Sequence, residues 1–268
     1  MNAPPLVEVE AMRVALRHRS GRPVTVLHDV SLEIARGSAC ALVGESGSGK
    51  STLGRALLGL IPAAGRVRFD GIEIGRLSPA ASRPLKARMQ MIFQDTQSAL
   101  NPRLRVETII TRPLEAFGRL SGRAARRERA AALLEAVALP PDFVDRYPHE
   151  LSGGQRQRVG IARAIALEPD FIVADEIVSG LDVSTQAQIL LLLHDLRQSM
   201  GLTLLFISHD LSVVRVLCDH VAVLLQGKIV ERGACETVFA APRHEYTRRL
   251  IEAAPLPDVE DGWLSRPV

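Results

Sequence analysis

The sequence predicts an α/β fold, in which helices cover a sheet of mostly parallel strands. Short, continuously apolar runs alternate along the chain with segments of helical periodicity, and such runs are typical of strands that are buried on both faces. A glycine-rich loop also joins one of these runs to a helix, which makes a strand–loop–helix unit. With 47% hydrophobic residues among 268, the chain can bury a sizeable core.

The expected strands and helices follow in order along the chain. Residues 38–43 predict a buried strand and residues 50–60 a helix, with the glycine-rich loop between them. Residues 66–74 alternate in polarity around Asp70-Gly71, which is typical of a hairpin. The other predicted elements are strands at 89–93, 171–174 and 203–207, helices at 156–167 and 183–200, and a second hairpin at 221–225 and 228–231.

The middle of the chain departs from this alternation. Residues 104–139 contain no strand-like run, and residues 123–138 are rich in Ala, Arg and Glu, so we expect a helical insertion there. The arginines between positions 123 and 129 are explained most simply as a solvated helix face, with contact to a partner as the alternative.

Composition and charge exclude several classes of protein. The formal net charge of +3 is too small to indicate nucleic-acid binding, so we expect no nucleic-acid partner. Cys40, Cys218 and Cys235 are far apart in sequence, which argues against a disulfide scaffold or a common zinc site. The first ten residues lack the features of a signal peptide, and no uncharged apolar run approaches the ~18 residues of a membrane span. Any membrane role is therefore expected to be peripheral, through a partner.

The glycine-rich loop carries the first chemical signal. Residues 44–51, Gly-Glu-Ser-Gly-Ser-Gly-Lys-Ser, match the phosphate-loop pattern G-x-x-x-x-G-K-[ST]. The glycines let backbone N–H groups converge on phosphate oxygens, and the helix that begins near Lys50 adds a positive dipole end. In this pattern Lys50 reaches the β- and γ-phosphates and the Ser51 hydroxyl binds Mg²⁺. The loop predicts binding of a nucleoside triphosphate.

A second signal is the apolar strand 171–174, which ends in Asp175 and Glu176. We expect Asp175 to lie at the edge of the sheet beside the phosphate loop, where it can hold Mg²⁺ through water. We expect Glu176, one residue further along the chain, to point to where an attacking water would lie. Many strands end in Asp-Glu at a helix cap, so this pattern alone indicates little. Together with the phosphate loop, it indicates a site for hydrolysis of a nucleoside triphosphate.

The third signal is Leu151-Ser-Gly-Gly-Gln155, which opens the predicted helix 156–167. Ser152 can cap that helix, while Gly153 and Gly154 expose backbone N–H donors. We interpret the motif as a second anion site rather than a plain glycine-rich helix cap.

The three motifs, in this order, resemble the nucleotide-binding subunit of an ABC transporter. The resemblance covers roughly residues 6–255 and implies a RecA-like P-loop NTPase core with an antiparallel β subdomain and an inserted helical subdomain. It places the ABC ATPase domain at 6–254, with core and β subdomain at about 6–94 and 159–234 and the helical subdomain at about 95–158. Residues 235–268 are expected to form a C-terminal helix and tail.

The resemblance also implies roles for individual residues. Gln94 matches the lid glutamine that senses Mg²⁺ and the membrane partner, and His209 matches the switch histidine that contacts the γ-phosphate, so both join Glu176 as catalytic candidates. Ser51, Gln94 and Asp175 are the expected magnesium ligands. The expected dimer-interface loop is Ser179, Gly180, Leu181 and Asp182. The residues expected to bind ATP are Gly44, Glu45, Ser46, Gly47, Ser48, Gly49, Lys50, Ser51, Thr52, Ser152, Gly153, Gly154 and Gln155.

The implied activity is hydrolysis of ATP, with Mg²⁺ as cofactor, to power import through a separate membrane channel. In the family the phosphate loop of one subunit faces the Ser-Gly-Gly of another, so the partners are expected to be a second ABC ATPase subunit, related or identical, and two transmembrane permease subunits. A solute-binding protein would take part indirectly. The expected location is the cytoplasmic face of the bacterial inner membrane.

Two further segments are similar to the peptide and nickel importers of this family. They are Phe93–Arg103, which follows the lid glutamine, and His244–Leu250 with Ala253-Ala-Pro255 after it. A peptide importer is the preferred hypothesis, and nickel or another small solute is the alternative. We expect the segment from Gln94 to Arg103 to contact the permease, with Leu100 as a cross-linking position.

The sequence departs from the family pattern at two points. Ile177 replaces the proline that usually follows Asp-Glu, and no aromatic residue lies at 14–18 to stack on adenine. Leu16 is the nearest match there, and His18 or His28 are the other candidates.

Two other classes of ATP- or GTP-binding protein compete with this hypothesis. A non-transport ABC ATPase would share every ATP motif, although such proteins often carry two nucleotide domains or large insertions. A nucleotide kinase or GTPase would lack Leu-Ser-Gly-Gly-Gln.

Overall fold

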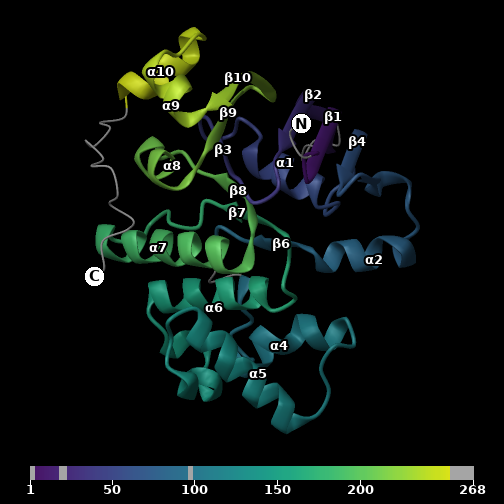
Figure 1. Cartoon of the computed structure of the whole chain (residues 1–268), viewed down its shortest axis with the longest axis vertical. Coiled ribbons are helices and arrows are strands. Elements are labelled where there is room, and N and C mark those ends of the chain that lie inside the picture. Colours follow the sequence, from purple (N-terminus) through teal and green to yellow (C-terminus); the bar gives the residue numbers. More distant parts are fainter. Residues whose placement is uncertain (1–3, 18–22, 96–98, 254–268) are drawn as a thin grey trace.

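The strands of the computed structural model form two sheets, which differ in strand direction (Figure 1). The structure describes residues 4–17, 23–95 and 99–253. One sheet has six strands in the order β10-β9-β3-β8-β7-β6, and the other has four in the order β2-β1-β4-β5. Within the described ranges, no helix combines the length and apolar character that crossing a membrane requires.

The six-stranded sheet is the core that the apolar runs predict. Its strands are β3 (Ala39–Val43), β6 (Met89–Ile92), β7 (Phe171–Asp175), β8 (Thr203–Ile207), β9 (His220–Leu225) and β10 (Lys228–Ala234). Every residue of β3, β7 and β8 is buried, as expected for strands covered on both faces. Only β10 runs antiparallel to its neighbour.

The register of the parallel strands brings their carboxyl ends to one edge. Leu42 and Asp175 both pair with Ile207, and Ile92 pairs with Ala174. The loops that follow β3, β6, β7 and β8 therefore begin side by side, although they are far apart in sequence. In open α/β sheets, ligands bind at this edge.

The two faces of this sheet pack against different layers. Alternate residues of a strand point to opposite faces, and Leu42, Val173 and Ile207 join a cluster with α1 (Lys50–Leu57) and the four-stranded sheet. Ala41 and Phe206 join the other cluster, which contains α6 (Gly153–Ile165), α7 (Val183–Met200) and α8 (Leu211–Leu217).

The four-stranded sheet is antiparallel throughout. Its strands are β1 (Val7–Arg17), β2 (Pro23–Ile34), β4 (Ala64–Phe69) and β5 (Ile72–Glu73). The predicted hairpin around Asp70-Gly71 is confirmed as β4–β5, whereas β1 and β2 were not predicted from the sequence.

The middle of the chain is helical, as the sequence predicts. Helices α4 (Val106–Ala116) and α5 (Arg123–Ala136) pack against α6, with the short 3₁₀ turns Pro141–Asp145 and Pro148–Glu150 before it. They form the end of the molecule opposite α10 (Glu245–Ala253), which Figure 1 shows in yellow. The arginines of α5 include Arg127, which pairs with Asp145 on this subdomain's own surface.

Several elements differ from the sequence-based expectation. Helix α6 begins at Gly153 rather than 156, because Ser152 caps it. The predicted helix at 50–60 ends at Leu57. Helices α8 and α9 (Cys235–Ala240) were not predicted because they are too short for a clear periodicity, and α2 (Pro79–Ala87) was not predicted because Pro84 lies inside it. All three cysteines are buried free thiols.

Candidate active site

The phosphate loop lies between β3 and α1, and its backbone requires glycine at two positions. Gly44 has φ 149°, and a Cβ atom there would lie 2.2 Å from the Leu224 carbonyl oxygen. Gly49 has φ 107°, and a Cβ atom would lie 2.9 Å from the Leu27 side chain. Both the backbone conformation and the close contacts exclude larger residues, so these glycines shape the loop.

Lys50 is held against this loop and is only 5% exposed. Its Nζ donates hydrogen bonds to the carbonyl oxygens of Gly44 at 2.7 Å and Glu45 at 2.9 Å, and lies 3.9 Å from Glu176 Oε1. Burial lowers the pKa of Lys50, and the nearby carboxylates of Glu176 and Asp175 oppose that shift. The loop therefore places a cation in a partly desolvated position, where it acts strongly on an anion.

Asp175 ends β7 and is fully buried. Its Oδ1 accepts a hydrogen bond of 2.8 Å from the Ser51 hydroxyl, while Oδ2 has no hydrogen-bond partner in the described part of the chain. Burial raises the pKa of Asp175, and the Ser51 hydrogen bond offsets only part of that rise. A buried carboxylate oxygen without a partner, beside a hydroxyl, fits a hard cation such as Mg²⁺.

Glu176 is the meeting point of the predicted catalytic residues. Its Oε2 accepts a hydrogen bond of 2.7 Å from Gln94 Nε2, and its Oε1 lies 3.6 Å from His209 Nδ1. The backbone at Glu176 is left-handed, with φ 47°, and its N–H donates to the Ile207 carbonyl oxygen at 2.9 Å. Left-handed backbone at a non-glycine residue costs energy and is found at functional sites.

A cavity of about 200 Å³ opens at this edge of the sheet. It is lined by Val26, Ser46, Gly47, Gly49, Lys50, Ser51, Thr52, Gln94 and Glu176. Ser48 Oγ is buried nearby without a hydrogen-bond partner in the described chain. Apart from Val26, every lining residue is one that the sequence predicts. Val26 was missed because it lies on β2, which carries no motif.

The Leu-Ser-Gly-Gly-Gln motif does not line the phosphate cavity; it lies at the start of α6. Ser152 Oγ accepts a hydrogen bond from the Gln155 N–H at 3.3 Å, and Gln155 Oε1 accepts one from the Ser152 N–H at 2.9 Å, so the two cap α6 reciprocally. A Cβ atom on Gly154 would lie 2.6 Å from Thr185 Cγ2, and Gly153 faces Leu181. Among the described residues that line the cavity, none belongs to 152–155.

The predicted interface loop connects Glu176 to α7. The Ser179 N–H donates to the Glu176 carbonyl oxygen at 3.1 Å. Asp182 caps α7 by accepting hydrogen bonds from the Thr185 N–H at 2.9 Å and from the hydroxyls of Ser184 and Thr185. These donors hold the pKa of Asp182 far below its usual value. Gly180 has φ 76°, which suits glycine at this turn.

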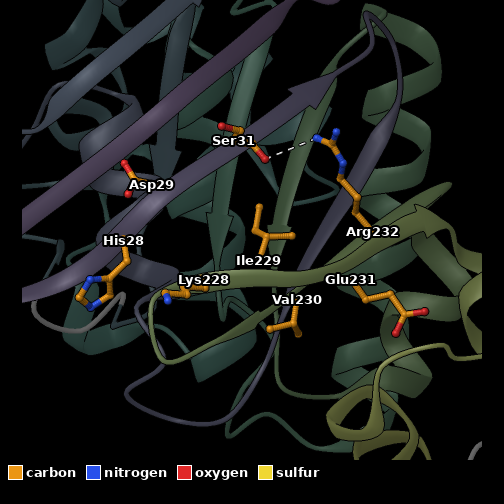
Figure 2. Close-up of a pocket in the computed structure, with 8 residues that line it drawn as sticks. All are labelled: His28, Asp29, Ser31, Lys228, Ile229, Val230, Glu231 and Arg232. Carbon is orange, nitrogen blue, oxygen red and sulfur yellow. Dashed lines mark hydrogen bonds between the residues drawn. The ribbon is translucent and has the colours of Figure 1, made fainter.

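The two described candidates for stacking on adenine, Leu16 and His28, do not line the phosphate cavity. His28 lines a separate cavity of about 540 Å³ between β2 and β10, where Figure 2 shows it beside Lys228. His18 lies outside the described residues. Leu16 is 39% exposed and pairs across the sheet with Val24, which is 50% exposed.

Comparisons with known proteins show what the chain is similar to. Residues 27–179 match the family model described as ABC transporter. The chain is 52% identical over 259 residues to a Brucella ovis protein named as a peptide import ATP-binding protein, covering 96% of this chain and 81% of that protein. It is also 52% identical over 246 residues to a Sinorhizobium fredii protein named as a peptide ABC transporter ATP-binding protein, covering 91% of this chain and 69% of that one.

Solved structures are similar over most of the chain. A dimeric ATP-binding cassette in a post-hydrolysis state, bound to ADP and Pi, has a TM-score of 0.76 at 29% identity, covering 85% of this chain and 98% of that one. The cbiO1 protein of Clostridium perfringens, part of an ABC transporter complex, has a TM-score of 0.75 at 27% identity, covering 89% of this chain and 92% of that one.

Proposed function

Because this chain belongs to the ABC transporter family, we propose that it is the ATP-hydrolysing subunit of a peptide importer and acts through a separate membrane permease. The observation that carries the proposal is the convergence of Lys50, Gln94 and His209 on Glu176 at one edge of the sheet. The names of the relatives at 52% identity support peptides as the solute.

The proposed mechanism assigns a task to each group at this edge. The loop N–H groups and Lys50 bind the phosphates of ATP. The carboxylate of Glu176 accepts a proton from a water molecule as that water attacks the γ-phosphorus. A new P–O bond forms while the bond to the bridging oxygen breaks, and ADP and phosphate leave. Gln94 and His209 orient Glu176 and the water.

We propose that Ser51 and Asp175 hold Mg²⁺, with Gln94 as the third ligand. Bound there, the ion would neutralise charge that develops on the phosphate oxygens. The hydrogen bond from Ser51 to Asp175 and the unpartnered Asp175 Oδ2 support this assignment.

The Asp175→Asn variant tests the magnesium assignment. An Asn Oδ1 can still accept the Ser51 hydrogen bond, so the fold should survive, but the negative charge is lost. We expect the gain in ATP affinity on adding MgCl₂ to shrink by about 10-fold or more, because a hydrogen bond or contact to a charged group contributes ~1.5–3 kcal/mol. Titration of ATP with MgCl₂ and with EDTA measures this, and an unchanged magnesium dependence would remove Asp175 from the metal site.

We also propose that the site is completed by a second ATPase subunit, whose Ser-Gly-Gly segment faces this phosphate loop. In this chain residues 152–155 cap α6 and the described lining of the cavity contains none of them, which supports completion from a partner. The dimeric form of the similar cassette supports it as well. Purification of the complex would show whether the partner chain is identical or related.

The permease is proposed to dock beside the segment after Gln94. Two adjoining cavities of about 430 and 520 Å³ share Ala99, Pro113 and Arg163. Residues of β6 help to line the first cavity, whereas the second is lined by residues 99–104, α4 and α6. Arg163 donates a hydrogen bond of 2.7 Å to the Ala99 carbonyl oxygen, which ties this segment to α6. Such a groove suits a short helix from a membrane partner. Because the permease is a membrane protein, the proposed location of this subunit is the cytoplasmic face of the bacterial inner membrane.

Cross-linking tests the permease contact. Leu100, the position expected from the sequence, is wrong as a probe because it is fully buried. Arg103 is exposed and lies in the same segment, so Arg103→Cys is expected to cross-link to a cysteine on a cytoplasmic permease helix. Ser199→Cys, exposed on α7, is the matched control, and the three native cysteines are buried. Equal yields from both variants, or none from Arg103→Cys in a transporting complex, would contradict the docking site.

The solute is tested by transport in proteoliposomes that contain the complete complex. Stimulation of ATP hydrolysis by peptides and uptake of a labelled peptide are the expected results. Stimulation by nickel or another small solute alone would favour the alternative importer, whereas hydrolysis without any permease partner would favour a non-transport ATPase.

A further inference from the structure

The C-terminal helix α10 reaches the phosphate loop through the side chain of Tyr246. The Tyr246 hydroxyl oxygen accepts a hydrogen bond of 2.8 Å from the backbone N–H of Glu45, across 201 residues of sequence. Glu45 is the second residue of the phosphate loop. Tyr246 is half-buried against the main hydrophobic cluster, and burial raises the pKa of its phenol, so the hydroxyl stays neutral.

The hydrogen bond acts on the peptide unit that also holds Lys50. The N–H of Glu45 and the carbonyl of Gly44 belong to one peptide plane, and the Gly44 oxygen accepts the 2.7 Å hydrogen bond from Lys50 Nζ. Tyr246 and Lys50 therefore form hydrogen bonds with the two ends of the same peptide unit. Because hydrogen bonds through a shared peptide polarise one another, the contact at the N–H strengthens the carbonyl as an acceptor.

Helix α10 is itself fixed to the core near Tyr246. The Glu231 carboxylate, on β10, accepts hydrogen bonds from the backbone N–H groups of Arg243 at 2.8 Å and His244 at 3.0 Å. Figure 2 shows this carboxylate directed away from His28 and toward the C-terminal segment. Although burial opposes it, these N–H donors hold the pKa of Glu231 below its usual value. His244 Nδ1 in turn accepts a hydrogen bond from the Tyr246 N–H at 3.1 Å.

We propose that Tyr246 is a positioning residue for ATP binding: through the Glu45 N–H it holds the first peptide of the phosphate loop, and with it Lys50, in the geometry that receives the phosphates. A path of contacts leads from Glu231 on β10 to the start of α10, and from Tyr246 on α10 to the phosphate loop. The inference rests on the proposed role of residues 44–51 as the ATP phosphate loop. Tyr246 touches no reacting atom, so its contribution is to affinity rather than to the chemical step.

The Tyr246→Phe variant tests the proposal because it removes the hydroxyl and keeps the ring. MgATP affinity of the purified chain is expected to fall by about 2- to 10-fold, the range of one hydrogen bond. In the assembled complex KM for ATP should rise by a similar factor while kcat changes less than about twofold. The backbone amide resonance of Glu45 should shift in a ¹H–¹⁵N spectrum. Tyr147→Phe, the other tyrosine, is the matched control.

A second variant tests the path to the core. Glu231→Gln weakens the attachment of α10, and it is expected to lower MgATP affinity less than Tyr246→Phe does. The double variant should be no weaker than Tyr246→Phe alone, since both changes act through one contact.

The outcomes separate this inference from the proposed function. If the parent chain fails to bind MgATP, the assignment of the phosphate loop is wrong. If the parent binds and Tyr246→Phe binds equally well, only the positioning role is overturned. A loss of affinity that appears equally in Tyr147→Phe, or that follows a fall in Tm, also overturns it, because general packing would then account for the effect.

Discussion

The Glu176→Gln variant is expected to hydrolyse ATP about 10²–10⁴-fold more slowly than the parent while binding MgATP at least as tightly, because positioned general-base catalysis contributes that much. The glutamine has nearly the same size, and its amide oxygen can still accept the hydrogen bond from Gln94 that now measures 2.7 Å. What is lost is the ability to accept a proton from the attacking water.

The charges of the site lead us to expect that Glu176→Gln still binds MgATP. Glu176 Oε1 lies 3.9 Å from Lys50 Nζ, so removing this negative charge leaves the cation free to act on the phosphates alone. If closure of the dimer needs ATP, the variant should also accumulate as an ATP-bound dimer with its partner.

The measurement is the steady-state rate of ATP hydrolysis in the assembled complex, beside MgATP affinity for each variant. Glu168→Gln is the matched control, because Glu168 is exposed and pairs with Arg129 at the surface, where such pairs contribute little. Near-normal turnover by Glu176→Gln would remove this residue from the catalytic role and put Gln94 or His209 forward instead.

The Lys50→Ala variant is expected to lose MgATP affinity by about 10- to 100-fold or more. A charge-assisted hydrogen bond contributes ~1.5–3 kcal/mol, and each 1.4 kcal/mol corresponds to about tenfold in affinity. The fold itself should persist, because burial already disfavours the charged form of Lys50, as the direction of its pKa shift indicates.

The chain supplies its own control for this experiment. It contains only three lysines, and Lys86 is exposed on α2, away from the described lining of the phosphate cavity. Fluorescence titration with a labelled nucleotide compares Lys50→Ala with Lys86→Ala, and thermal unfolding checks both. An affinity equal to the parent's in Lys50→Ala would contradict the assignment of the phosphate loop.

The central part of the fold could be predicted because its signals are local. The strand at Thr203–Ile207 and the helix at Val183–Met200 have the predicted bounds, since a fully buried strand is a continuous apolar run and a long helix repeats its pattern several times. The glycines of the phosphate loop could be located for the same reason: each satisfies a local backbone requirement.

The long strands β1 and β2 were harder to predict because bulges interrupt their alternation. The pairing of β1 with β2 shifts register between Val9 and Met12, and Ala11 between them has φ 47°. On β2, Asp29 has φ 50°. Each irregularity moves the following side chains to the other face, so the period of two that identifies a strand is broken.

Residue patterns were sufficient to identify the phosphate loop with Lys50, and Asp175 and Glu176 at the end of a buried strand. In contrast, the packing of distant segments brings Gln94 and His209 to Glu176, and the Tyr246 hydroxyl to the Glu45 N–H. The two kinds of information differ in the sequence distance over which they act. A residue pattern encodes burial and hydrogen bonding over a few residues, whereas a contact across 201 residues depends on strand order and on how the helices pack over the sheet.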